Sequence, residues 1–184
     1  MGGTYDGVVG FCLTDMLPCI QRAMAEALEN IMDIGIPENQ RLAVAEHLSR
    51  LLADTYVLYL KTHNFHWNVK GPRFRELHLM WEEQYTAMWT DIDVIAERIR
   101  ALGEPAPATY KRFMALASIE ETEGVPTADD MLQLLLDGHE AVVRTARAAL
   151  PIADDANDEV TVDLLTQRLE FHEKTAWMLR TSRA

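Results

Sequence analysis

Apolar side chains recur every three or four positions between Phe74 and Leu102, as on a helix that is buried along one face. Pro72 suits the first position of such a helix, and Gly103 suits the residue just past its end. The pattern therefore predicts one long helix over about 72–102, preceded by a tight turn.

Three further stretches have the helical period, and none has the alternation of a strand. Residues 38–65 form the first predicted helix, on whose apolar stripe His63 is expected to be a core histidine. The third is expected to begin after Thr127, which suits an N-cap, and to end at Pro151. The fourth is expected to begin near Asn157 or Asp158, and a short helix is expected over 108–118, in the connection between helices two and three. These elements predict an all-α four-helix bundle with one long connection.

A second stripe on the helix over 72–102 carries metal-type ligands beside the apolar face. His78 and Glu82 form one i, i+4 pair, and Asp93 and Glu97 form another on the same side of the helix. The two pairs are roughly 16 Å apart at 1.5 Å per residue, so no single ion could bind both pairs of one chain. An identical helix packed antiparallel about a two-fold axis would place His78 opposite the partner's Glu97, and Glu82 opposite the partner's Asp93, which gives two equal sites.

The motif H-W-N-V-x-G-x-x-F at 66–74, followed by H-x-x-x-E and by D-x-x-x-E-R-x-x-x-L-G, resembles the Dps proteins, mini-ferritins named as DNA-binding proteins from starved cells. The resemblance implies a ferritin-like domain over 37–184, a hollow shell of twelve subunits and ferroxidase sites between two-fold-related subunits. The implied iron ligands are His66, His78 and Glu82 of one chain with Asp93 and Glu97 of its partner. Glu82 departs from the family pattern, which usually has Asp there, and its extra methylene displaces the carboxylate by about a bond length.

The resemblance also implies a chemistry, which is oxidation of Fe²⁺ with hydrogen peroxide, storage of ferric mineral and protection against oxidative stress. Mixed imidazole and carboxylate ligands suit iron, whereas thiolates would have favoured zinc. Other ferritins build an intrachain site from Glu-x-x-His pairs, and no histidine here has a glutamate three residues before it. Trp67 could accept a stray oxidising equivalent or could simply pack at the helix end, and the sequence leaves both roles open.

An acidic set near the start of the fourth helix has two readings. Asp154, Glu159 and Asp163 match the positions that line a three-fold pore in mini-ferritins, where they would concentrate Fe²⁺ on its way into the shell. Carboxylates also stabilise a helix N-terminus without binding any ligand.

The formal net charge of −12 argues against DNA binding through bulk charge. No lysine precedes Lys61, and Arg180 and Arg183 make only a weak basic C-terminus. The alternative function is a nucleoid-associated shell that compacts DNA. Because of this charge, we do not expect DNA binding.

The first 36 residues are predicted to be an N-terminal extension, partly helical or disordered. They contain both cysteines, Cys12 and Cys19, which fit neither a zinc site nor a disulfide framework and so indicate a reducing cytoplasm. No apolar run reaches the ~18 residues that would suggest a membrane span, and no signal peptide is expected.

Overall fold

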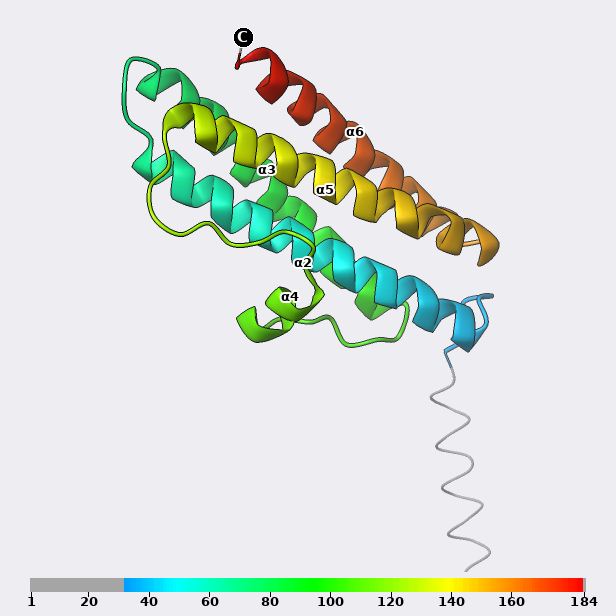
Figure 1. Cartoon of the computed structure of the whole chain (residues 1–184). Coiled ribbons are helices and arrows are strands. Elements are labelled where there is room, and N and C mark those ends of the chain that lie inside the picture. The colour runs from blue at the N-terminus through cyan, green and yellow to red at the C-terminus, as the bar shows by residue number, and fades with distance from the viewer. Residues whose placement is uncertain (1–31, 184) are drawn as a thin grey trace, which may run out of the picture. The chain divides into compact units, whose positions relative to one another are not determined.

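The computed structural model describes residues 32–183, which contain helices and no strands. The extension predicted over residues 1–36 lies almost entirely outside the described residues. The helices are α2 (Glu38–Asn68), α3 (Phe74–Ala101), α4 (Tyr110–Leu116), α5 (Ala128–Asp155) and α6 (Glu159–Thr181) (Figure 1). The prediction of an all-α bundle with a short extra helix between its second and third long helices is confirmed.

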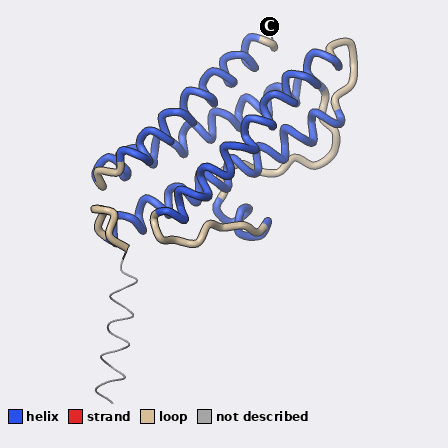
Figure 2. Tube along the Cα trace, turned by 180° about the vertical axis from the view of Figure 1, so that it is seen from behind, coloured by secondary structure: helices blue, strands red, loops and turns tan. Residues whose placement is uncertain are grey.

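The four long helices form two antiparallel hairpins, α2 with α3 and α5 with α6 (Figure 2). The hairpins pack together mainly through α2 and α5, while α4 lies against the outer side of α2. The apolar stripe predicted on α3 lies mostly in the core, where Leu77, Trp81, Met88, Ile95, Ile99 and Leu102 are buried. Phe74, at the start of the same stripe, is exposed.

The helix ends follow local rules with two departures from the predicted bounds. Gly103 closes α3 with φ 99°, and the Glu104 N–H donates to the Ile99 carbonyl at 3.2 Å. Pro72 lies in the turn before α3 instead of at its first helical position, because the Phe74 N–H donates to the Gly71 carbonyl and the helix begins there.

Pro151 does not end α5, contrary to the prediction. The helix continues to Asp155 because its last turn buries small side chains, Ala149 and Ala153, and because Asn157 then adopts φ 52°. The Asp158 N–H donates to the Ala153 carbonyl at 3.0 Å and so closes the turn. The N-cap predicted at the other end is confirmed, since the Thr127 hydroxyl accepts from the Asp130 N–H.

Two buried carboxylates hold the helices in register. Asp54, on α2, is 1% exposed and accepts hydrogen bonds from the Ser118 N–H and from the Thr145 hydroxyl, both at 2.6 Å, which fixes the long connection and α5. Asp158, the N-cap of α6, pairs with Arg98 of α3 at 2.6 Å. Burial favours a raised pKa for Asp158, but hydrogen bonds from Arg98 and Thr161 outweigh it and the pKa is lowered.

None of the helices in the described part of the chain has the length and apolar character needed to cross a membrane.

Candidate metal centre

The α2–α3 hairpin brings His66 and His78 face to face. Their rings stack with centroids 3.7 Å apart and planes inclined by 16°. His66 Nδ1 lies 2.7 Å from the His78 carbonyl oxygen, and His78 Nδ1 lies 2.8 Å from the His66 carbonyl oxygen. Because a carbonyl oxygen can only accept, both Nδ1 atoms donate, which leaves Nε2 of each ring as the nitrogen that can bind a metal ion. This reciprocal pair of hydrogen bonds therefore presents two imidazole nitrogens in the tautomer that binds a metal ion.

Glu82 completes a group of three potential metal ligands at this place. It lies one helical turn after His78, and the ligand atoms of the three residues lie within 4.8 Å of one another. His66 is 6% exposed, His78 is half-buried and Glu82 is exposed, so the group opens outward from the bundle. Two nitrogens and a carboxylate suit iron and leave coordination positions open.

Asp93 and Glu97 lie on the same helix but do not join this group. Both are exposed, and among the residues that the structure describes His66, His78 and Glu82 form the only cluster of three potential metal ligands. A single chain thus brings together three of the five predicted ligands. The sharing of Asp93 and Glu97 with a partner remains a prediction.

His63 was predicted to be a core histidine, and the structure shows it half-buried beside the ligands instead. Its ring stacks on Tyr85 at 4.0 Å and lies 4.2 Å from the ring of Trp67. Burial, followed by the neighbouring His66, lowers the pKa of His63 and keeps the ring neutral. Trp67 is 63% exposed even though it contacts His63. Within one chain it is therefore not buried by packing at the end of α2.

The three residues of the predicted pore are all exposed at one end of the α5–α6 hairpin. Asp154 lies in the last turn of α5, whereas Glu159 and Asp163 lie in the first turns of α6. Asp163 accepts a hydrogen bond from Gln167 at 2.7 Å. Their role in a pore remains a prediction.

The core contains a pair of buried histidines, one from α5 and one from α6. His172 Nδ1 lies 2.8 Å from His139 Nδ1, and both side chains are fully buried. Burial lowers the pKa of His139 to about 3 and, together with His139 and Arg168, lowers that of His172 well below its usual value. The spacing of His139 from Leu135 and Val142 places it on the buried face of α5, so the helical period alone could have indicated a core histidine there.

Comparisons with known proteins agree with this fold. The ferritin-like domain family matches residues 45–183. DNA protection during starvation protein 2 of Bacillus anthracis is 43% identical over 137 residues, which cover 74% of this chain and 94% of that protein. A crystal structure of a Dps protein from Vibrio cholerae O1, described as a ferritin-like diiron-carboxylate protein, is 32% identical with a TM-score of 0.80 and covers 84% of this chain and 99% of that one. A crystal structure of a Dps protein from Bacillus brevis is 38% identical with a TM-score of 0.77, and the match covers 79% of this chain and 98% of that one. The chain therefore belongs to the Dps family of ferritin-like proteins.

Proposed function

We propose that this chain is a ferroxidase and iron-storage protein that oxidises Fe²⁺ with hydrogen peroxide and keeps the ferric mineral inside a hollow shell of its own copies. The observation that carries the proposal is the reciprocal hydrogen bonding of His66 and His78. It fixes both rings with Nε2 free beside the Glu82 carboxylate, before any ion arrives. Storage and protection against oxidative stress follow the function implied by the Dps relatives.

The site is completed by a second copy of the chain. Three ligands from one chain leave an iron ion under-coordinated, and Asp93 and Glu97 are exposed on the same helix with no cluster of their own. An antiparallel α3 from a partner brings the partner's Asp93 and the partner's Glu97 to the open side. Large exposed apolar side chains accompany the potential ligands on α3, as expected of a surface that another protein covers: Leu79, Trp89 and Val94.

The reaction at the shared site is an oxidation of two ferrous ions by one peroxide. Each Fe²⁺ gives one electron, both oxygens of the peroxide leave as water with protons from solvent, and no hydroxyl radical is released. The two imidazoles and the carboxylates hold the ferrous ions at the site, while the open coordination positions let ferric product leave for the interior.

Iron reaches the interior through pores at the three-fold axes of a twelve-subunit shell. Repeated three times, Asp154, Glu159 and Asp163 would make a ring of carboxylates that attracts Fe²⁺. All three side chains are exposed, which this role requires. DNA compaction, the alternative function, is disfavoured by the net charge of −12, although relatives carry DNA protection in their names.

The test is an anaerobic titration of the assembled protein with Fe²⁺, followed by addition of hydrogen peroxide. We expect saturable binding of ferrous iron and rapid formation of ferric iron with one peroxide consumed for two Fe²⁺. His78→Ala should lose most of the rapid phase, whereas the matched control His47→Ala, elsewhere on α2, should keep it. Equal rapid oxidation by wild type and His78→Ala would exclude the proposed site.

A further inference from the structure

Four tyrosines lead away from the candidate metal centre in one continuous line. The Tyr85 ring lies edge-on to His66 at 5.1 Å, and Tyr59 follows Tyr85 at 6.3 Å. Tyr56 follows Tyr59 at 6.0 Å, and Tyr110 of α4 follows Tyr56 at 6.1 Å. These centroid separations are those of aromatic rings in contact. We call Tyr85, Tyr59, Tyr56 and Tyr110 the tyrosine ladder.

The ladder differs from the aromatic packing of a core. Tyr85, Tyr59 and Tyr56 are only half-buried, and Tyr110 is 67% exposed. Phe113, which does pack into the core, stacks on Tyr56 at 4.5 Å and already provides the apolar contact there. The ladder contains every tyrosine in the described residues, and the sequence has only one more, Tyr5.

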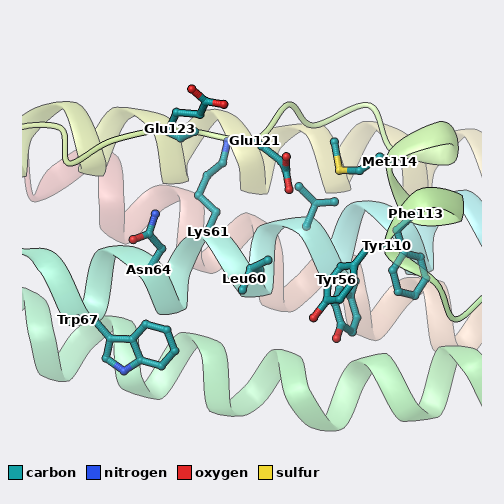
Figure 3. Close-up of a pocket in the computed structure, with 12 residues that line it drawn as sticks. Tyr56, Leu60, Lys61, Asn64, Trp67, Tyr110, Phe113, Met114, Glu121 and Glu123 are labelled. Carbon is teal, nitrogen blue, oxygen red and sulfur yellow. The ribbon is translucent and has the colours of Figure 1, made fainter.

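Its outer end combines a hydrogen bond with access for a small molecule. The phenols of Tyr56 and Tyr110 lie together (Figure 3), and burial and a hydrogen bond with Tyr110 raise the pKa of Tyr56. A phenol gives up an electron most easily when its proton can move at the same time, and a hydrogen-bonded pair of phenols allows this. Both rings line a groove of about 380 Å³ between α2, α4 and the segment after α4, which also contains Lys61 and Glu121.

We propose that the tyrosine ladder supplies the missing electron when peroxide meets a site that holds a single Fe²⁺, and that the oxidised state then moves to Tyr110. The proposal rests on the proposed ferroxidase function. Peroxide takes one electron from Fe²⁺ and one from the phenol of Tyr85. With the phenol proton and one proton from solvent, it leaves as two water molecules, so the products are Fe³⁺ and a neutral tyrosyl radical.

Each further step moves one electron along the ladder toward the site. Tyr59 reduces the Tyr85 radical, Tyr56 reduces the resulting Tyr59 radical, and Tyr110 reduces the resulting Tyr56 radical. Each reduced tyrosine regains its phenol proton from water or from its neighbour. The radical on Tyr110 is finally quenched by a hydrogen atom from a small reductant of the ascorbate type, which the groove admits. The oxidised state is thereby moved away from the metal ligands to an exposed side chain, which a reductant dissolved in the solvent can restore.

The first experiment needs no iron. Pulse radiolysis of the assembled protein with azide radicals oxidises tryptophans, and Trp89 lies 6.0 Å from Tyr59. We expect first-order conversion of tryptophan radicals into tyrosyl radicals in wild type, a several-fold slower conversion in Tyr59→Phe, and no change in the control Tyr5→Phe. Unchanged kinetics in Tyr59→Phe would overturn the ladder as a path.

The second experiment uses the oxidant itself. Wild-type shells receive half the Fe²⁺ needed to fill their sites, then hydrogen peroxide and a nitroso spin trap, and the trapped residue is located by mass spectrometry. We expect an adduct on Tyr110 that is lost in Tyr59→Phe, is retained in Tyr5→Phe and nearly disappears when the sites are filled or ascorbate is added. Circular dichroism and shell mass establish that each variant is folded.

Ferric iron is measured in the same samples, so the two proposals fail separately. Normal oxidation of Fe²⁺ with no tyrosine adduct at half filling would refute the ladder and leave the ferroxidase function intact. Absence of rapid oxidation in wild type would refute the ferroxidase function and, with it, the source of the radical. An adduct on Tyr110 that persists in Tyr59→Phe would show that the radical reaches Tyr110 by another route.

Discussion

Mixing two inactive variants is the sharpest test of a site shared between chains. His78→Ala removes a ligand from the His66–Glu82 side of the site, and Asp93→Ala removes one that we assign to the opposite side. In a two-fold dimer each variant alone damages both sites, so each pure protein should lose most rapid ferrous oxidation. A dimer with one chain of each kind has one site with both lesions and one site with none.

The expected recovery follows from the pairing. When equal amounts of the two variants are dissociated and reassembled at random, half the dimers are mixed, and about a quarter of all sites are intact. Rapid oxidation of Fe²⁺, followed by stopped-flow absorbance after peroxide addition, should therefore return to about a quarter of the wild-type amplitude.

The distance along α3 makes the opposite outcome informative. His78 and Asp93 are 15 positions apart in the sequence, and helical rise separates them by roughly 22 Å, too far for one ion to bind both in one chain. A site within one chain would leave every mixed shell inactive. No recovery in shells whose mixed composition is verified by native mass spectrometry would refute the shared site.

Three further predictions concern stability and surface charge. Stability to urea should fall as pH drops from 6.5 toward about 3, by about 1.4 kcal/mol per pH unit for His139, because the unfolded chain binds a proton that folded His139 does not. His172, whose pKa is also lowered, makes the fall steeper in the same direction. Asp158→Asn keeps an N-cap but leaves Arg98 without its buried partner, which should cost about 3 kcal/mol in the urea-unfolding free energy. At physiological salt, the assembled protein should not retard plasmid DNA in a gel, because its net charge of −12 repels phosphate.

Each of these has a control or a contrary result. The double variant His139→Leu/His172→Leu should show a flatter pH dependence, and an unchanged slope would mean that other groups produce it. Arg50→Ala removes an exposed ion pair with Glu46 and should cost well under 1 kcal/mol of unfolding free energy. An equally small loss for Asp158→Asn would contradict the argument that burial makes the Arg98–Asp158 pair costly to break. Salt-sensitive retardation of DNA at low protein concentration would contradict the charge argument.

The bundle could be predicted from the sequence because its helices bury periodic stripes and end at residues with strong local preferences, such as Thr127 and Gly103. Pro151 misled the prediction because the packing and capping of the last turn of α5 outweigh the hydrogen bond that proline removes. The prediction for His63 was wrong because a spacing of three or four residues does not distinguish the buried face of a helix from its flank, where His63 stacks on Tyr85.

The candidate site was predictable in its residue types but not in its construction. Spacing indicated that His78 and Glu82 share a face, and the motif added His66. Nothing in the periodicity indicates that each imidazole donates to the other's carbonyl, because that contact depends on the path of the turn at 69–73. The tyrosine ladder likewise joins α2, α3 and α4, which only tertiary packing brings together.

The reciprocal hydrogen bonds between His66 and His78 require the turn at 69–73 to keep its present length. Each ring contacts the backbone of the other helix, so it is insensitive to most side-chain changes around it but sensitive to the helical register. One residue inserted at 69–73 and absorbed as extra helix would advance the facing carbonyl by about 1.5 Å and turn it by about 100°. Both rings would then lose their partners at once. We therefore expect substitutions to be tolerated in this turn, whereas a single insertion or deletion would abolish iron binding in a protein that still folds and assembles.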